Sequence, residues 1–332
     1  MVPGIDTFLR EQLVERRDKL ENAIRAEPAQ RLQVLLSEVD SALARFDNGS
    51  FGICETCHDP IESDRLMADP LVRFCLSHLS SEDRDALERD LQLAARVQRG
   101  LLPNQDTLER YGWQICYHYE PASLVSGDYC DVIDGGEAGL FFIVGDASGK
   151  GVAASMLMAH LHAMFRTLIP MGLSLPCMLE HASHVFCEST LPNQYATLVC
   201  GRALADGRIE FVNAGHPLPL VAKKGGGVIV VETSDFPIGL FCQGKFSVTE
   251  LRLEPAESMV IYSDGVSDTT NASGEEYGTE RLRNLIATNG ANPASALLAA
   301  CRDDLAAFRS KARRTDDVTL FVLARKHGSV QH

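Results

Sequence analysis

Residues 139–151 read GLFFIVGDASGKG, an apolar run that ends in an aspartate and a glycine-rich turn. A continuous apolar run of this length predicts a strand that is buried on both faces. Asp146 then lies at the end of a buried strand, where a charged side chain must be paired or must bind a metal ion. The segment therefore predicts a buried sheet with a polar site at its edge. It is not a Walker A loop, because three residues rather than four separate Gly145 and Gly149, and Gly151 stands where Ser or Thr is required.

Two further aspartate motifs also lie at the ends of apolar runs. Asp264 follows the apolar run 259–262, and Asp316 and Asp317 directly precede the apolar run 318–323. Taken singly, such motifs are also ordinary turns and strand caps. Taken together, they predict carboxylates gathered around cations, and hard oxygen ligands select Mg²⁺ or Mn²⁺. Two such ions ~3.5–4 Å apart would hold a bridging water, lower its pKa and clamp phosphoryl oxygens for in-line attack.

The rest of the second half alternates short apolar runs with helical patterns. Strands are predicted at residues 139–145, 196–200, 209–213, 228–231, 258–263 and 318–323. Helices are predicted at residues 152–168, 174–188, 279–287 and 293–310. Strands in runs with few helices between them favour a sheet-rich α+β layer fold over a strict βαβ repeat.

The first hundred residues have helical periodicity instead. Residues 5–47 predict a helical hairpin broken near Pro28. Residues 82–102 predict a further helix, ended by Pro103, with a short coiled-coil-like seam that begins at Leu87 and Leu91.

Three cysteines and a histidine cluster between these helices. Cys54 and Cys57 are separated by two residues, and Cys75 and His78 repeat this spacing 17 residues further on. Two such knuckles predict a tetrahedral site of three thiolates and one imidazole, which favours a structural zinc ion. His58 is a spare candidate for the fourth ligand. A redox C-x-x-C motif and unrelated buried thiols are the alternatives.

The run LARFDNGSFGICETCHDPI, residues 43–61, resembles the zinc finger of the DksA/TraR family. The resemblance covers roughly residues 10–80 and implies a helical hairpin with a zinc knuckle. That family usually has four cysteines, and His78 stands where the fourth is expected. The turn Arg25-Ala-Glu-Pro-Ala lacks the paired aspartates with which DksA enters RNA polymerase, so a docking or dimerisation module is favoured.

The aspartate motifs, in this order, resemble the metal-dependent protein phosphatases of the protein phosphatase 2C family, in particular the bacterial SpoIIE/RsbU branch. The resemblance spans roughly residues 85–326 and includes the lead-in LQLAARVQRGLLP (91–103), NAGHP (213–217) and FPIGL (236–240). It implies an αββα four-layer sandwich of two stacked sheets with metal ions at one edge.

The resemblance also implies roles for individual residues. Asp146 corresponds to the ligand that bridges both ions, and the carbonyl oxygen of Ala147 joins it. Asp264 and Asp316 or Asp317 correspond to further ligands; the motif favours Asp316, and spacing alone leaves both open. Asp146 and Asp264 are therefore also the expected catalytic residues.

Asp128, in Ser126-Gly127-Asp128, corresponds to the first acidic ligand. Asp131 ranks below Asp128, because the two face opposite sides of an extended strand.

Three other residues near these motifs are open in role. Ser148 stands where eukaryotic relatives have a histidine suited to protonating the leaving group. His216 is read as structural in preference to a proton donor, and Lys150 as either a phosphate contact or a solvated lysine.

Composition limits the class of protein further. The net charge of −14 disfavours binding of nucleic acid, because the electrostatic field of an acidic chain does not attract a negatively charged polymer. The first residues are charged and predict no signal peptide. The most apolar stretch, 152–168, is expected not to span a membrane, because His160, His162 and Arg166 interrupt it. The seven other cysteines (Cys116, Cys130, Cys177, Cys187, Cys200, Cys242 and Cys301) are expected to be separate thiols in a reducing cytoplasm.

The sequence thus predicts three parts: a hairpin with a zinc finger (1–80), a linker helix (81–103) and a phosphatase domain (104–326). The main hypothesis is a cytoplasmic serine/threonine phosphatase with two Mn²⁺ or Mg²⁺ ions and one structural Zn²⁺. The resemblance implies an anti-anti-sigma (STAS) protein as substrate, and the helix 82–102 suggests a homodimer. The alternative is a DksA-like, transcription-associated binding protein with a weak or silent phosphatase.

Overall fold

The computed structural model describes residues 5–26, 30–62, 65–66, 69–78, 81–103, 107–191 and 194–326. The chain separates into two compact units, Met1–Asp90 and Leu91–His332. Each unit has its own hydrophobic core, and each is described by itself.

The first unit is a helical hairpin followed by a small irregular module. Helix α1 (Ile5–Ala26) packs against α2 (Gln30–Asp47), and their apolar faces supply Leu9, Leu13 and Val39 to a core that also contains Cys54 and Cys75. The expected turn at residues 25–29 lies largely outside the described residues. After α2, the chain forms turns and a short 3₁₀ helix, η1 (Leu76–His78).

Helix α4 (Ser81–Arg99) forms where the linker helix is predicted. It ends at Arg99, four residues before Pro103, because Gly100 follows and terminates the helix. Leu87 is exposed on it, whereas Ala95 and Gln98 are buried.

The second unit contains two antiparallel sheets. The six-stranded sheet has the order β1-β2-β11-β10-β7-β8, and the five-stranded sheet has the order β3-β4-β5-β6-β9. The strands of the first are β1 (Thr107–Arg110), β2 (Trp113–Glu120), β7 (Leu220–Ala222), β8 (Val228–Val230), β10 (Ser258–Tyr262) and β11 (Val318–Arg325). Those of the second are β3 (Asp128–Asp134), β4 (Leu140–Ala147), β5 (Ala196–Ala203), β6 (Arg208–Ala214) and β9 (Thr249–Arg252).

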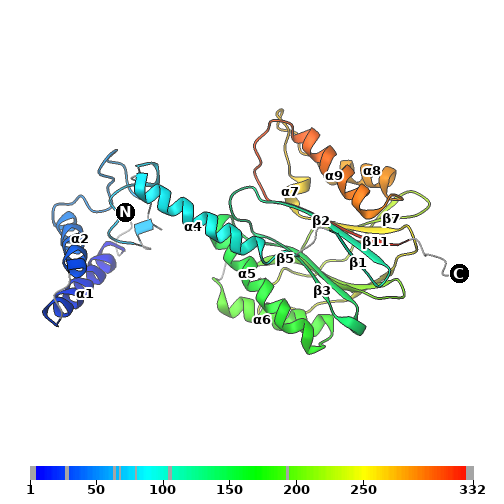
Figure 1. Cartoon of the computed structure of the whole chain (residues 1–332), viewed down its shortest axis with the longest axis horizontal. Helices are drawn as coiled ribbons and strands as arrows, with labels where there is room; N and C mark the ends of the chain where they lie inside the picture. The colour runs from blue at the N-terminus through cyan, green and yellow to red at the C-terminus, as the bar shows by residue number, and fades with distance from the viewer. Residues whose placement is uncertain are drawn as a thin grey trace. The chain divides into compact units, whose positions relative to one another are not determined.

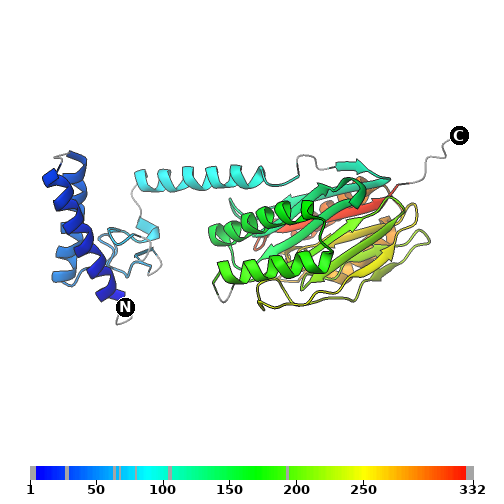
Figure 2. The same ribbon diagram turned by 90° about the horizontal axis from the view of Figure 1, so that it is seen from below.

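Helices cover both outer faces of this pair of sheets. Helices α5 (Gly151–Leu168) and α6 (Leu175–Ser189) lie on one side, and α8 (Thr279–Asn289) and α9 (Ala294–Arg309) lie on the other (Figure 1). Figure 2 shows α5 and α6, in green, side by side along their sheet. The shorter elements are η2 (Gly136–Ala138), η3 (Ile169–Met171) and α7 (Asp264–Ser267).

Three apolar clusters correspond to the three interfaces between the four layers. Residues such as Phe165 and Phe186 fill the layer between α5, α6 and the five-stranded sheet. Phe142 and Phe321 stack between the two sheets, with ring centroids 6.0 Å apart. Val260 belongs to the cluster under α8 and α9. The predicted α+β four-layer sandwich is therefore present.

Helix α5 with η3, Gly151–Met171, is the one described helical segment that is long and apolar enough to cross a membrane by length and composition. It contains the stretch 152–168, which the sequence identifies as the most apolar. In the fold, Leu157, Met158, Leu161 and Phe165 of this helix are buried in the domain core, whereas Val152 and Met156 are exposed.

Two cysteines expected to be separate thiols are bonded to each other. Cys187, near the end of α6, forms a disulfide with Cys242, and their Cα atoms are 5.3 Å apart. The two residues are 55 positions apart in the sequence, so only the packing of α6 against the 235–247 segment brings them together. The expectation was wrong for this pair.

Candidate metal centres

The first two carboxylates face each other across a pair of neighbouring strands. Asp128 of β3 is the direct register partner of Asp146 of β4. Gly127 permits this approach, because a Cβ atom there would lie 2.8 Å from the Ala147 carbonyl oxygen and 3.1 Å from Oδ1 of Asp146. The predicted carboxylates Asp128 and Asp146, and the carbonyl of Ala147, thus lie at one end of the five-stranded sheet.

The other two carboxylates come from the six-stranded sheet. Asp264 follows β10 and opens the short helix α7, and Asp316 lies just before β11. Gly265 packs directly on this second segment, since a Cβ atom there would lie 1.9 Å from the Asp317 carbonyl oxygen and 3.3 Å from Cβ of Asp316. The Asp264 and Asp316 segments are therefore in contact.

Three of these four carboxylates line one open pocket of about 530 Å³, whereas Asp128 is not among its lining residues. Asp146, Asp264 and Asp316 line it together with Ser148, Gly149, Lys150, Tyr195, Thr197, Gly215, His216, Pro217 and Leu218. Residues as far apart in the sequence as Asp146 and Asp316 therefore line one hollow.

Burial and mutual repulsion raise the pKa values of these carboxyl groups. Burial raises the pKa of Asp146 to about 7, with repulsion from Asp264 and Asp316 in the same direction and attraction to Lys150 opposing it. Burial, and then repulsion from Asp316, raises the pKa of Asp264. The pKa of Asp128 is raised well above its usual value, first by burial and then by Asp146. Such a group favours a cation, which would let all three carboxyls ionise.

A hydroxyl from the opposite sheet holds Asp128 in place. Thr319 of β11 donates from Oγ1 to Oδ2 of Asp128 at 2.5 Å, and the Asp128 amide donates to Oγ of Ser126 at 3.0 Å. The Thr319 amide in turn donates to Oγ of Ser263. Thr319 thus connects the two sheets at the candidate site. The sequence Asp-Asp-Val-Thr gives no sign of this role, because Asp128 lies 191 residues away in the chain.

The structure also distinguishes Asp316 from Asp317. Both carboxylate oxygens of Asp317 accept backbone hydrogen bonds, from Ala122 N at 2.6 Å and from Gly127 N at 2.9 Å. Asp316 points into the pocket and accepts a hydrogen bond from Nζ of Lys150 at 2.8 Å. These contacts favour Asp316 as the ligand and give Asp317 a bracing role. Lys150 lies at the pocket beside a carboxylate.

The loop before Asp128 has a second brace from α4. The Gln98 side chain accepts a hydrogen bond from Ser126 N at 3.0 Å and donates to Ser126 O at 2.6 Å. Gln98 lies within the lead-in segment 91–103, and its local sequence gives no sign of this contact.

Asp131 is not part of this pocket. Its side chain lies on the other face of β3, as strand geometry predicts, and accepts two hydrogen bonds from Arg166 of α5, at 2.6 and 2.8 Å. It therefore anchors a helix to the sheet.

His216 lines the pocket but is held by the protein. Its Nδ1 lies 3.0 Å from Oγ1 of Thr197, and its backbone is bound on both sides by the Asn213 side chain. Burial lowers the pKa of His216 to about 3, so its imidazole is neutral at neutral pH. This agrees with the structural reading. Ser148, in the position of the missing histidine, accepts a hydrogen bond from Tyr195 N at 2.9 Å.

A separate candidate centre lies in the first unit. Cys54, Cys57, Cys75 and His78 place their ligand atoms within 4.8 Å of one another, and no other set of three or more His, Cys, Asp or Glu residues in the described chain does so. Sγ of Cys57 is 3.7 Å from Sγ of Cys75, which is 3.3 Å from Nδ1 of His78. Tetrahedral zinc with Zn–S bonds of about 2.3 Å separates two sulfurs by about 3.8 Å, so this group fits zinc. His58 lies outside the group.

The thiols of this centre have unequal proton affinities. Burial works to raise the pKa of Cys54, but amide hydrogen bonds from Cys57, Cys75 and Thr56 outweigh it and lower the pKa to about 6. For Cys57, an amide hydrogen bond from Asp59 is opposed by burial and by the other thiols, which raise its pKa to about 11. A bound cation would remove this conflict by keeping all the thiols ionised.

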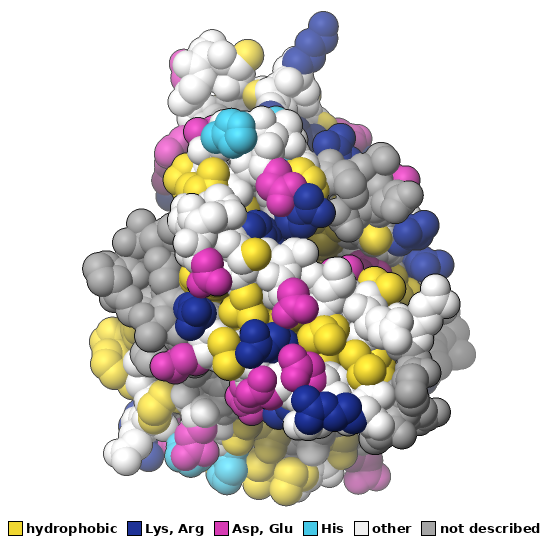
Figure 3. Space-filling model, turned by 90° about the vertical axis from the view of Figure 1, so that its left-hand side faces the viewer, with side chains coloured by type: hydrophobic (Ala, Val, Ile, Leu, Met, Phe, Trp, Pro, Cys, Tyr) yellow, Lys and Arg dark blue, Asp and Glu magenta, His cyan; other side chains and the backbone are white. Residues whose placement is uncertain are grey.

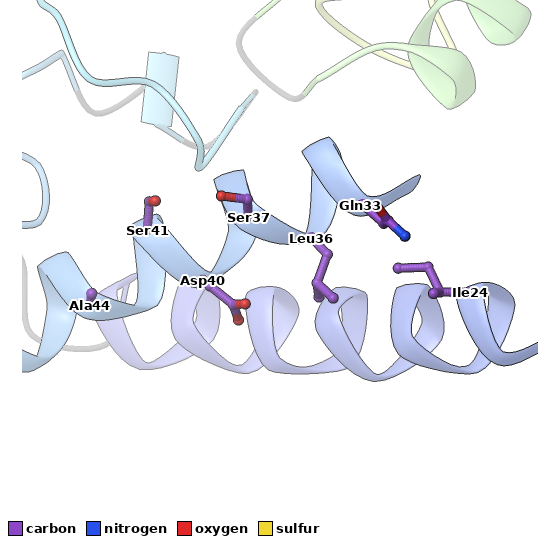
Figure 4. Close-up of a pocket in the computed structure, with 7 residues that line it drawn as sticks. All are labelled: Ile24, Gln33, Leu36, Ser37, Asp40, Ser41 and Ala44. Atoms are coloured by element: carbon purple, nitrogen blue, oxygen red, sulfur yellow. The ribbon is translucent and has the colours of Figure 1, made fainter. Parts of the chain in front are cut away.

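Two other surface features carry no comparable chemistry. A hollow of about 490 Å³ on the hairpin is lined by Ile24 of α1 and by residues of α2 from Gln33 to Ala44 (Figure 4). It contains no member of either centre. On the face in Figure 3, Lys and Arg side chains are interspersed with Asp and Glu, without a continuous basic area.

Comparisons with known proteins agree with this fold. The phosphatase 2C domain of SiaA from Pseudomonas aeruginosa superposes with a TM-score of 0.64 at 19% identity, covering 76% of this chain and all of that domain. The phosphatase domain of SpoIIE from Bacillus subtilis, with a fragment of its regulatory domain, gives a TM-score of 0.56 at 18% identity and covers 66% of this chain and 64% of that one. At this identity the similarity establishes a fold of the protein phosphatase 2C type.

The model of the stage II sporulation protein E (SpoIIE) family matches residues 136–326, more than half of the chain. The chain belongs to the SpoIIE family. Residues 49–77 match the prokaryotic dksA/traR C4-type zinc finger, a range that ends one residue before His78.

Among curated relatives, phosphoserine phosphatase RsbP of Bacillus subtilis is 29% identical over 188 residues, which cover 55% of this chain and 46% of RsbP. Protein IcfG of Synechocystis is 24% identical over 279 residues, which cover 74% of this chain and 43% of IcfG. The chain thus spans less than half the length of either relative.

Proposed function

We propose that the chain is a metal-dependent protein serine/threonine phosphatase, and that its substrate is a phosphorylated anti-anti-sigma (STAS) protein of a partner-switching pathway. Membership of the SpoIIE family and the similarity to a phosphoserine phosphatase support the reaction class. The substrate class is inferred from the resemblance of residues 85–326 to the SpoIIE/RsbU branch.

One observation carries the proposal. Asp128, Asp146, Asp264 and Asp316 come from strands in two different sheets and converge at one end of the sandwich, where burial and repulsion raise the pKa values of the first three. Such an arrangement is unfavourable by itself and becomes favourable with cations bound. Asp146, Asp264 and Asp316 line one wide pocket, and no three carboxylates of the described residues bring their oxygens within 4.8 Å of one another.

Carboxylate and carbonyl oxygens are the ligands of Mn²⁺ and Mg²⁺, so the donor set fits these ions. Asp146 and Ala147 would hold both ions, and Asp128, Asp264 and Asp316 would complete the site. When bound, two such ions supply charge neutralisation for phosphoryl oxygens and activation of a water nucleophile.

The chain's own residues have separate tasks in this proposal. Asp146 and Asp264 define the place of reaction, and Thr319 holds one carboxylate oxygen of Asp128 by a hydrogen bond. Asp317 and Gln98 keep the 122–127 loop fixed beside the pocket. His216, neutral and hydrogen-bonded, shapes the pocket wall.

The remaining parts of the proposal concern organisation. Residues 1–80 form a zinc module whose closed set of Cys54, Cys57, Cys75 and His78 is structural, because four protein ligands leave no open position. Helix α4 links it to the phosphatase domain and supplies a surface for a homodimer. We place the protein in the cytoplasm.

The test is phosphate release by the full chain from p-nitrophenyl phosphate and from a phosphorylated STAS protein, with and without Mn²⁺. Asp264→Asn preserves shape but removes a charged ligand, so we expect Mn²⁺-dependent release to fall by at least about 100-fold. Asp303→Asn, an exposed change on α9, is the control and should have no effect.

Unchanged Mn²⁺-dependent release by Asp264→Asn would refute the metal assignment. Release from p-nitrophenyl phosphate without release from any STAS protein would refute the substrate. No release from either, with retention of RNA polymerase in a pull-down, would favour the DksA-like alternative.

A further inference from the structure

Large apolar side chains are exposed on two loops beside the candidate active site. We name Leu191, Tyr195, Phe236, Leu240 and Phe241 the apolar rim. Phe236 is 66% exposed, Leu191 63% and Phe241 54%, and the rings of Phe236 and Phe241 pack edge to face with centroids 5.1 Å apart. Exposed apolar groups of this size in one place mark interaction surfaces.

Backbone contacts place the rim directly against the pocket wall. Tyr195 itself lines the pocket. The next residue, Ala196, exchanges two backbone hydrogen bonds with Ile238, at 2.8 and 2.9 Å. A Cβ atom on the pocket residue Gly215 would lie 2.6 Å from Cγ of Pro237. The segment 236–241 is therefore continuous with the wall of the pocket.

The two loops are also held to one another and to α6. A Cβ atom on Gly239 would lie 3.4 Å from the Gln194 carbonyl oxygen and 2.4 Å from Cδ1 of Phe186. Gly239 N donates to Oγ of Ser183, and Cys242 is bonded to Cys187. The rim is thus built on a supported surface, although its own side chains remain in water.

Helix α5 extends this surface on one side. Val152 and Met156 are exposed and four residues apart, so they share a face of the helix. His160 continues this face and stacks on Phe186, which is the residue that Gly239 contacts.

The charge of the rim differs from that of the chain. Residues 189–196 contain no charged residue, and residues 236–248 contain one lysine and no acid, in a chain with a net charge of −14. Apolar groups beside a pocket that accepts a phosphate suit a partner that is apolar around its phosphorylated residue. The acidic chain as a whole disfavours an anionic lipid surface as the partner.

We propose that the apolar rim docks the substrate protein by covering apolar side chains on either side of its phosphoserine or phosphothreonine. This rests on the proposed phosphatase function and adds a rule for which phosphoproteins are chosen. A small phosphorylated molecule in the pocket can touch only Tyr195 of the rim, whereas a protein whose phosphoresidue enters the pocket also covers Leu191, Phe236, Leu240 and Phe241. The rim therefore selects among substrates and does not act on the reacting atoms.

The test uses the full chain with Mn²⁺ and three probes. Two phosphoserine peptides of equal length and net charge differ only in their flanks, which are Leu, Val and Phe in one and Asn, Ser and Gly in the other; p-nitrophenyl phosphate is the third. We expect the wild type to favour the apolar-flanked peptide by about tenfold in kcat/KM, because covering one large apolar side chain contributes about one factor of ten in affinity.

The double variant Phe236→Ser, Phe241→Ser should lose this preference while hydrolysis of p-nitrophenyl phosphate stays within about twofold of wild type. Both positions are exposed, so the substitutions should leave the fold intact. Met171→Ser is the matched control: Met171 is 63% exposed and lies beyond the far end of α5, about 27 Å from its start by helix rise. It should keep the preference.

Each outcome has a distinct meaning. Equal kcat/KM for both peptides in the wild type, or an unchanged preference in the double variant, would overturn the docking proposal. A wild-type dimer in sedimentation that the double variant converts to monomer, with no loss of preference, would assign the rim to a second copy of the chain instead. Failure to hydrolyse even p-nitrophenyl phosphate would instead refute the phosphatase function itself.

Discussion

Asp128 and Asp131, three residues apart in β3, show how the surroundings of a carboxylate determine its role. Asp128 is 1% exposed and Asp131 0% exposed. Asp131 has the guanidinium of Arg166 as a fixed counter-charge, whereas Asp128 has the Thr319 hydroxyl and faces another carboxylate, Asp146. A buried carboxylate without a cationic partner is costly, so Asp128 is the one suited to a metal ion.

Asp146 gives a prediction about pH. Its pKa is about 7 in the fold, against about 3.9 in an unfolded chain. The folded state therefore binds this proton more tightly, and the resulting stability is fully present below pH 4 and is lost as the pH rises through 7. Without divalent cations, we expect Asp146→Asn to raise the midpoint of thermal unfolding at pH 8, by about 2–4 °C for each kcal/mol that it adds to the free energy of unfolding. The increase should be smaller at pH 5.5, because Asp146 is already protonated there.

Thermal unfolding in the presence of a chelator, followed by circular dichroism at both pH values, measures this effect. Asp131→Asn is the control, and it should change the midpoint in the opposite direction. It leaves Arg166 without its carboxylate partner, so the midpoint should fall at both pH values. A lower midpoint for Asp146→Asn at pH 8 would contradict the account of repulsion among the carboxylates.

At the scale of elements, the loop 121–127 is held from two sides. The last turn of α4 reaches it through Gln98, and the start of β11 reaches it through Asp317. Asp128 follows immediately, so the position of this candidate ligand depends on elements far away in the sequence. The end of the linker helix is thereby part of the support of the site.

We therefore predict that Gln98→Ala weakens metal binding. It leaves the amide and carbonyl of Ser126 without their partner, at a cost of about 1–3 kcal/mol for each buried group. The Mn²⁺ concentration for half-maximal hydrolysis of p-nitrophenyl phosphate should rise several-fold, since supporting contacts of a metal site contribute about 10–100-fold in affinity. Arg96→Ala, on the exposed side of α4, is the control; equal Mn²⁺ dependence of both variants would contradict this role.

At the scale of the whole molecule, the two units have separate cores. The first has a small core that includes Cys54 and Cys75, and the second has three large apolar clusters. A small domain of this kind commonly depends on its metal ion for stability. The phosphatase unit contains all of the predicted Mn²⁺ or Mg²⁺ ligands.

Loss of zinc should therefore affect one unit alone. We expect Cys75→Ser to lose bound zinc and amide protection in residues 5–78 while Mn²⁺-dependent hydrolysis of p-nitrophenyl phosphate remains within about twofold of wild type. Cys177→Ser, outside the cluster, should retain zinc. Hydrogen exchange and metal analysis test this, and loss of protection in residues 107–326 would contradict the independence of the units.

Sequence patterns identified those elements whose signal is local. The apolar runs of β4, β10 and β11 are continuous and end in aspartate, so both the strands and the candidate ligands at their ends could be predicted. The zinc ligands were predictable for the same reason, since each knuckle spans four residues. By contrast, no apolar run marks β3, because its sequence, DYCDVID, contains three aspartates, which are rare in strands; only the comparison of Asp128 with Asp131 treats this segment as extended.

Local sequence alone thus determined which segments are buried strands, which carboxylates end them, and that thiolates at metal spacing lie near the N-terminus. The tertiary structure alone determined that Asp128 faces Asp146, that Asp317 braces a loop while Asp316 faces the pocket, and that Cys187 meets Cys242. The physical reason is the distance along the chain over which each effect acts. Apolar patterning and turn preferences depend on neighbouring residues in the sequence. The pairing of Asp128 with Asp146, the different roles of Asp316 and Asp317, and the Cys187–Cys242 disulfide depend on contacts between residues that only packing brings together.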